Sequence, residues 1–93
     1  MNVKVVKLIT SEEFIAEVES ISDGTLNVKN PIRLIPMEKS VMPLPLSLLV
    51  DENEVINISI AKTIYVAKPA EHIENMYRQT VGGIVIPPKK LIV

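Results

Sequence analysis

The side chains suited to acid, base or nucleophilic chemistry are few in this chain and poorly spaced. Glu12 and Glu13 are adjacent, so in an extended segment they point to opposite sides and do not form a carboxylate pair. His72 is the single histidine, and it would have to serve as the base for any nucleophilic serine. None of the serines lies in a nucleophile elbow; they are Ser11, Ser20, Ser22, Ser40, Ser47 and Ser59. We therefore expect a protein that is not an enzyme.

Composition gives metal and phosphate chemistry little support. The chain has no cysteine, which excludes a thiolate metal site, and one histidine does not make a zinc site, so we expect no metal and no cofactor. The net charge of −1 excludes a broad attraction to nucleic acid. Either a local basic surface or scattered lysines on polar strand faces fits this charge; the residues concerned are Lys29, Arg33, Lys39 and Lys62.

A polar pair with a defined spacing occurs at Asp23 and Asn27. Asp23 precedes Gly24, and Asp-Gly is a strong hairpin signal because both residues tolerate the positive φ of a type I′ turn. Asp23 is then either a turn residue bonded to its own backbone or part of a nucleotide-binding loop. Asn27 faces away from the apolar side of its strand, so it is either a solvated hairpin residue or a contact to a base.

Three predicted strands position this turn. In residues 3–9 the apolar alternation slips between Val5 and Val6, which indicates burial on both faces or a bulge. Phe14, Ala16 and Val18 then share one face of a second strand. In the third strand, alternation predicts an apolar face made of Leu26, Val28, Ile32 and Leu34, and a polar face made of Thr25, Asn27, Lys29 and Arg33. Pro31 indicates a bend or an edge there.

Two further strands complete the predicted sheet. Residues 42–50 alternate cleanly, and Pro43 and Pro45 remove two donors from the same edge, so this strand pairs fully on one side only. After an acidic turn at residues 51–54, residues 56–66 form the most regular alternating strand of the chain.

The pattern changes after Pro69. Apolar residues recur at helical spacing, which predicts a helix over residues 70–81 that Gly82-Gly83 ends; they are Ile73, Met76, Tyr77 and Val81. The tail, residues 82–93, is apolar at both ends with a polyproline-like centre that cannot be helical. Exposed apolar ends are an aggregation hazard, so we expect the tail to dock on its own barrel or on a neighbouring subunit.

Length and composition favour one mainly β domain, residues 1–93. Hydrophobic residues are 47% of the chain and charged residues 23%, which excludes a disordered tail, and the many β-branched residues favour strands. Lys4 and Lys7 interrupt the first apolar residues, so we expect no signal peptide. The longest apolar run, residues 41–50, is far shorter than the ~20 residues that span a bilayer. We expect a cytoplasmic protein without a membrane partner.

The order strand, turn, strand, Asp-Gly turn, strand resembles the first sequence motif of Sm-like (LSm) proteins, in which Asp-x-x-x-Asn leads into an apolar strand. Residues 23–28 reproduce that segment in order and spacing, and the resemblance covers roughly residues 3–67. It implies a five-stranded antiparallel Sm-like or SH3-like barrel over about residues 3–67, in which the first strand meets the fifth, followed by the helix and the extended tail.

The resemblance also implies an RNA-binding site. The family's second motif carries Arg-Gly or Lys-Gly, and the corresponding stretch here is Ile60-Ala61-Lys62-Thr63, so only Lys62 is carried over. The implied site consists of Asp23, Asn27 and Lys62 from adjacent subunits.

Three features depart from the family pattern. The chain starts with a strand instead of a helix, Ala16-Glu17 replaces the glycine usual in the second strand, and Thr25 holds the position of an aromatic or histidine that stacks on a base. In these respects the chain is most similar to small, divergent Sm-like proteins encoded by bacterial viruses.

Sm-like barrels close rings by pairing the fourth strand of one subunit with the fifth strand of the next. The resemblance therefore implies a homo-oligomeric ring of about five to seven subunits, with single-stranded RNA as a partner. The alternative is a viral structural or assembly protein, in the cytoplasm of an infected bacterial cell, whose ring formation is itself the function. A small adaptor barrel that binds a peptide is a third hypothesis.

Overall fold

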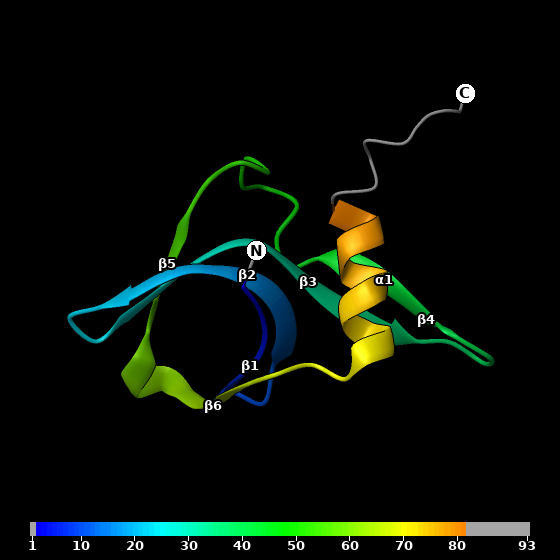
Figure 1. Ribbon diagram of the computed structural model, residues 1–93, viewed down its shortest axis with the longest axis horizontal. Helices are drawn as coiled ribbons and strands as arrows, with labels where there is room; N and C mark the ends of the chain where they lie inside the picture. The colour runs from blue at the N-terminus through cyan, green and yellow to red at the C-terminus, as the bar shows by residue number, and fades with distance from the viewer. Residues whose placement is uncertain (1, 82–93) are drawn as a thin grey trace.

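The computed structural model describes residues 2–81, and these residues form a mainly β fold with one C-terminal helix, as the sequence predicts (Figure 1). The elements are β1 (Val3–Leu8), β2 (Glu13–Ser22), β3 (Thr25–Pro36), β4 (Val41–Pro45), β5 (Ile56–Ser59), the 3₁₀ turn η1 (Ile60–Lys62), β6 (Thr63–Ala67) and α1 (Glu71–Val81). No helix of this described part is long and apolar enough to cross a bilayer. The expected extended tail, residues 82–93, and the glycines that end the helix lie outside the described residues.

All six strands belong to one curved antiparallel sheet with the order β4-β3-β2-β1-β6 (Figure 1). β3 is long enough to pair on its second edge with two strands, with β5 along Thr25–Val28 and with β4 along Ile32–Pro36. The sheet does not close, because among the described residues β5 pairs with β3 and β6 pairs with β1, and η1 joins them without a ladder.

The predicted strand over residues 56–66 is therefore two strands. η1 interrupts it at residues 60–62, and the hydroxyl of Thr63 donates to the carbonyl oxygen of Ile60 at 2.8 Å. The predicted strand over residues 42–50 is also shorter, because β4 ends at Pro45. The first strand does pair with the last, as predicted, in the β1–β6 ladder.

The turn between β2 and β3 is the predicted tight hairpin. Asp23 and Gly24 have φ values of 47° and 73°, and Ser22 and Thr25 form the closing pair. Positive φ at both central residues is what a type I′ turn requires.

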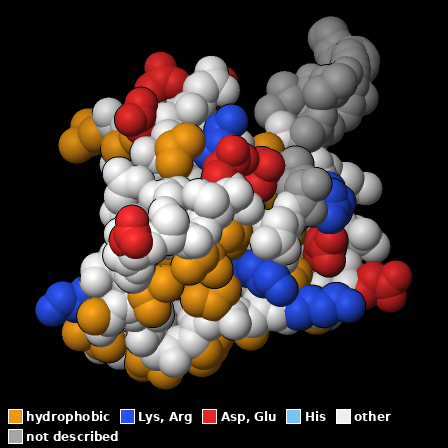
Figure 2. Space-filling model, turned by 60° about the vertical axis from the view of Figure 1, so that its left-hand side comes forward, with side chains coloured by type: hydrophobic (Ala, Val, Ile, Leu, Met, Phe, Trp, Pro, Cys, Tyr) orange, Lys and Arg blue, Asp and Glu red, His pale blue; other side chains and the backbone are white. Residues whose placement is uncertain are grey.

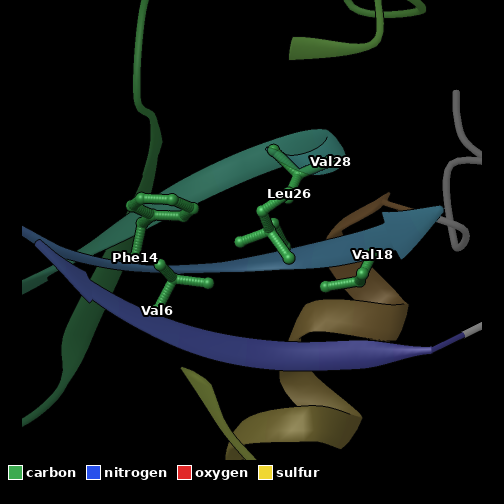
Figure 3. Packing of buried hydrophobic residues seen from close by; sticks show 6 residues of the cluster. Val6, Phe14, Val18, Leu26 and Val28 are labelled. Atoms are coloured by element: carbon green, nitrogen blue, oxygen red, sulfur yellow. The ribbon is translucent and has the colours of Figure 1, made fainter. Parts of the chain in front are cut away.

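The concave side of the sheet holds the main core. Its buried residues come from β1, β2 and β3 (Figure 3). Partly buried residues of β5 and η1 pack against them. They are Val6, Phe14, Ala16, Val18, Leu26 and Val28. The predicted shared face of Phe14, Ala16 and Val18 is confirmed. Burying one Val, Leu or Phe side chain contributes about 1.5–3 kcal/mol.

A second core lies on the convex side of the sheet, beneath α1. Val3, Ile15 and Ile32 pack there against Tyr77 of the helix, with Ile73 and Val81 beside them. The slip in the alternation of β1 thus reflects burial on both faces, since Val3 belongs to this second core and Val6 to the first. The packing face predicted for α1 is confirmed for Ile73, Tyr77 and Val81, whereas Met76, the fourth residue of that spacing, is not part of the second core.

A β-bulge in β3 divides the strand into two parts, and the apolar side chains of each part face a different core. Glu17 pairs with Lys29 and Ile15 with Ile32, so one residue of β2, Ala16, opposes two residues of β3, Asn30 and Pro31. Asn30 has a φ of 50°. Pro31 has no backbone N–H, so its place in the bulge leaves no donor unpaired. The predicted bend at Pro31 is confirmed.

The extra residue reverses the alternation beyond it. Leu26 and Val28 face the first core, whereas Ile32 and Leu34 pack in or against the second, so the single apolar face predicted for these four residues is wrong. The predicted polar face fails for the same reason, because the insertion puts Lys29 and Arg33 on opposite faces of β3.

Candidate functional site

Asn27 lies at the centre of a row of hydrogen-bonded side chains that crosses three strands. Its amide nitrogen donates to the hydroxyl of Ser20 on β2 at 2.9 Å, and its amide oxygen accepts a hydrogen bond from the side chain of Asn57 on β5. Both partners are in register with it, in the β2–β3 and β3–β5 ladders. Asn27 is thus held in one orientation on the convex face of the sheet, opposite the buried side chains of Leu26 and Val28.

A second row of small polar residues lies beside the first. Ser22, Thr25 and Ser59 are in register across the same three strands. We call the two rows together the polar ladder: Ser20, Ser22, Thr25, Asn27, Asn57 and Ser59. It is uncharged, and all its members are exposed except Thr25 and Asn27, which are half-buried.

The other two predicted site residues lie near one end of the polar ladder. Asp23 is exposed in the turn after Ser22, and the N–H of Ile60 donates to the carbonyl oxygen of its neighbour Gly24 at 2.9 Å. Lys62 is the last residue of η1, and its carbonyl oxygen accepts from the N–H of Ile9 at 2.9 Å. Backbone bonds therefore join the Asp23-Gly24 turn to the 3₁₀ turn that carries Lys62.

The side chains of these two residues are not engaged with each other. Among residues 2–81, no hydrogen bond or ion pair involves the Asp23 carboxylate or the Lys62 ammonium group. The backbone brings Asp23 and Lys62 toward one end of the sheet, and Asn27 lies farther along β3 with its own partners. A single chain thus offers separate polar groups instead of a closed site.

Electrostatics and stacking at this surface are weak. The four candidate phosphate contacts do not form one basic surface, because Lys29 and Arg33 lie on opposite faces of β3, and the buried Nε of Arg33 has no partner among the described residues. Phe14 and Tyr77 are buried. Tyr65 is exposed on β6, where its hydroxyl donates to the Glu13 carboxylate, and this hydrogen bond raises the pKa of Tyr65. The polar ladder therefore suits hydrogen bonding better than base stacking.

The remaining chemistry-bearing residues are scattered. His72 is exposed on α1, and Glu12 and Glu13 lie in the β1–β2 turn and at the start of β2. Within residues 2–81 no three His, Asp or Glu side chains gather closely enough to hold a metal ion.

Sequence reasoning missed four residues of the polar ladder, Ser20, Ser22, Asn57 and Ser59, and the first and third of these bond to Asn27. Ser20 could have been predicted, because counting outward from the Asp23-Gly24 turn pairs Ser22 with Thr25 and then Ser20 with Asn27, before the irregularity between Val18 and Ser20. Asn57 alternates with Ile56 and Ile58, which places it on the polar face of β5, but no local pattern says that β5 pairs with β3.

No protein-family model matches the chain, and no curated protein is significantly similar to it.

Proposed function

We propose that this chain is an Sm-like subunit that assembles into a homo-oligomeric ring. The proposal rests on two strand edges that lack a backbone partner among the described residues, one on β5 (Ile56–Ser59) and one on β6 (Thr63–Ala67). We call these two edges the seam. Each of these strands pairs with one neighbour among the described residues, so each leaves one edge without a backbone partner. Unpaired strand edges bind other strands readily, and an assembly that pairs them removes this hazard.

Apolar side chains surround the seam. On β6, Ile64 is 58% exposed, and Tyr65 and Val66 are exposed as well. Figure 2 turns forward the side on which β5 and η1 lie in Figure 1, and hydrophobic side chains gather in one area of its lower half. A second copy pairing at the seam would remove part of this surface from water, at about 25 cal/mol per Å² of apolar area.

The outer edge of β4 is a poor alternative for assembly. The N–H of Leu46 donates to the carbonyl oxygen of Pro31 at 2.9 Å, so even-numbered residues of this segment direct their N–H groups to β3. The backbone nitrogen atoms of Pro43 and Pro45 therefore lie on the outer edge of β4, and that edge lacks two N–H donors. Contacts from β5 of one subunit to β6 of the next are identical around the assembly, and they give a ring when the rotation closes. The resemblance to Sm-like proteins implies about five to seven subunits in such a ring.

The test of this interface is a charged substitution at the seam. Ile64→Lys puts an ammonium group at the proposed joint, and we expect sedimentation to show dissociation toward the 10.3 kDa monomer. Met37→Lys is the matched control, because Met37 is 52% exposed but lies in the β3–β4 turn. An Ile64→Lys chain with the same mass as the unmodified chain would reject β6 as the joint.

We propose that the RNA contact, when one forms, uses the polar ladder together with Asp23 and Lys62. Asn27 keeps one N–H and one lone pair beyond its bonds to Ser20 and Asn57, and these groups match the edge of a base. Titration of short oligo-U and oligo-A at two salt concentrations tests the contact. Asn27→Ala and Lys62→Ala should weaken binding, and Asn2→Ala, an exposed asparagine outside the polar ladder, should not.

The second candidate is a viral structural ring without RNA. Two observations favour it over the RNA reading: Thr25 holds the stacking position, and the net charge is −1. A ring of the expected mass that binds neither oligonucleotide would support this candidate and remove the RNA contact.

A further inference from the structure

A groove lies between the sheet and the end of α1. Its volume is about 470 Å³, and it is bounded by the bulged part of β3, by β4, by the β4–β5 loop and by the last residues of α1. This volume lies in the range of about 300–1,000 Å³ in which protein pockets enclose small ligands, so several side chains of an extended segment fit. Pro43, Leu44, Pro45 and Val81 make much of the wall apolar.

The β4–β5 loop leaves large apolar side chains in water beside this groove. Leu48 lines the groove and is 84% exposed, and its neighbour Leu49 is 95% exposed. The following residues of the loop carry the charge: Asp51, Glu52 and Glu54 line the groove, and within residues 2–81 no lysine or arginine does so. The groove is therefore complementary to an apolar segment that also carries positive charge.

The chain itself supplies such a segment at the mouth of the groove. Val81, the last described residue, is part of the wall. Residues 82–93 follow, with the sequence Gly-Gly-Ile-Val-Ile-Pro-Pro-Lys-Lys-Leu-Ile-Val. At about 3.3–3.6 Å per extended residue, these twelve residues can reach at most about 40–43 Å from Val81. Two glycines permit a change of direction directly after the wall.

We propose that the groove is the docking site of the same chain's tail, with residues 84–86 on the apolar wall and Lys89 and Lys90 beside the acidic loop. Attachment through two residues gives the tail an effective concentration in the millimolar range, which favours it over a free peptide of equal affinity. This contact is largely distinct from the proposed ring, because the groove is lined mainly by β3, β4 and the β4–β5 loop and reaches β5 only at Ile56, whereas the ring would form through the free edges of β5 and β6.

Engineered disulfides test the placement in the full chain, which has no native cysteine. Leu48→Cys is combined with Ile86→Cys, and the chain is oxidised mildly and mapped by mass spectrometry. We expect an intrachain disulfide at a yield at least about tenfold above that of the control pair, Ser11→Cys with Ile86→Cys. Ser11 is exposed in the β1–β2 turn and has no part in the groove.

Two results would overturn the proposal. A yield no higher than the control shows that the tail does not enter the groove. A disulfide between two chains, identified by mixing isotope-labelled with unlabelled protein, assigns the groove to a neighbour's tail instead.

Charge reversal tests the acidic loop independently. Lys89→Glu with Lys90→Glu should lower the yield of the Leu48→Cys/Ile86→Cys disulfide by about two- to tenfold, the range for two exposed ion pairs. Adding Asp51→Lys and Glu52→Lys should restore it. A yield that stays constant in all these chains would overturn the pairing of the lysines with the loop.

Discussion

The hydroxyl of Tyr77 donates a hydrogen bond to the carbonyl oxygen of Asn30, 2.9 Å away and 47 residues earlier in the chain. Asn30 is the residue of the bulge with positive φ, and the same hydroxyl also reaches the carbonyl oxygen of Lys29 at 3.3 Å. These carbonyl groups lie where the bulge interrupts the ladder, so the helix satisfies polar atoms that the sheet does not. α1 therefore helps to stabilise the bulge of β3, which separates the part of the strand that pairs with β5 from the part that pairs with β4.

Removing the Tyr77 hydroxyl should destabilise the fold moderately. Tyr77→Phe keeps the ring in the second core and loses the hydrogen bonds to the bulge, at about 0.5–1.5 kcal/mol. Tyr77→Ala also removes the ring, which is 1% exposed, at about 3–5 kcal/mol. Urea unfolding measures both, with Tyr65→Phe as the control on an exposed tyrosine. A Tyr77→Phe chain as stable as the unmodified chain would show that the bulge does not depend on the helix.

Stability should fall in alkali through the same residue. Burial raises the pKa of Tyr77 from its ordinary value of 10.0 to about 12. Between these values the folded state holds a proton that the unfolded state releases, so the contribution of Tyr77 is complete below pH 10 and declines as the pH rises toward 12. Unfolding at a series of pH values should show a steeper alkaline loss in the unmodified chain than in Tyr77→Phe. Equal slopes would contradict this assignment.

The hairpin turn gives a prediction about backbone strain alone. Gly24 has a φ of 73°, and a Cβ built there meets nothing within 4 Å. Gly24→Ala should therefore cost about 1–2 kcal/mol from the left-handed conformation itself, and Gly24→Asn should cost less because asparagine tolerates that region. Chemical denaturation compares the two variants. Equal losses would point to a steric cause that the structure does not show.

Local patterns predicted the elements whose contacts are local. The Asp23-Gly24 turn specified its hairpin, the alternation of Phe14 to Val18 specified a core face, and the spacing of Ile73, Tyr77 and Val81 specified the packing face of α1. In each case the residues that form the pattern also form the contact or the backbone geometry.

The bulge and the break at η1 could not be read in the same way. Leu26, Val28, Ile32 and Leu34 are all at even positions, so the alternation continues through the inserted residue and hides the change of face. The available signal was the dipeptide Asn30-Pro31, which marks a turn or a loop more than a strand. Residues 56–66 hid η1 similarly, because Ile58, Ile60 and Ile64 keep one parity through the turn.

The candidate site was predicted only in part. Asn27 was identified from the motif, but its orientation depends on Ser20 and Asn57, and the second of these arrives from a strand 30 residues away. The alternation along the strand predicts that Lys29 and Arg33 share one face. The bulge inserts one extra residue between them, so they lie on opposite faces. Long-range pairing decides such features, and it has no local signature.

The central claim is that the open edges of β5 and β6 join copies of this chain. Light scattering of the unmodified full chain at micromolar concentration tests it most directly. The account predicts a single species of about five to seven times the 10.3 kDa of one chain. A species of 10.3 kDa would contradict it and leave the exposed edge of β6 without a partner.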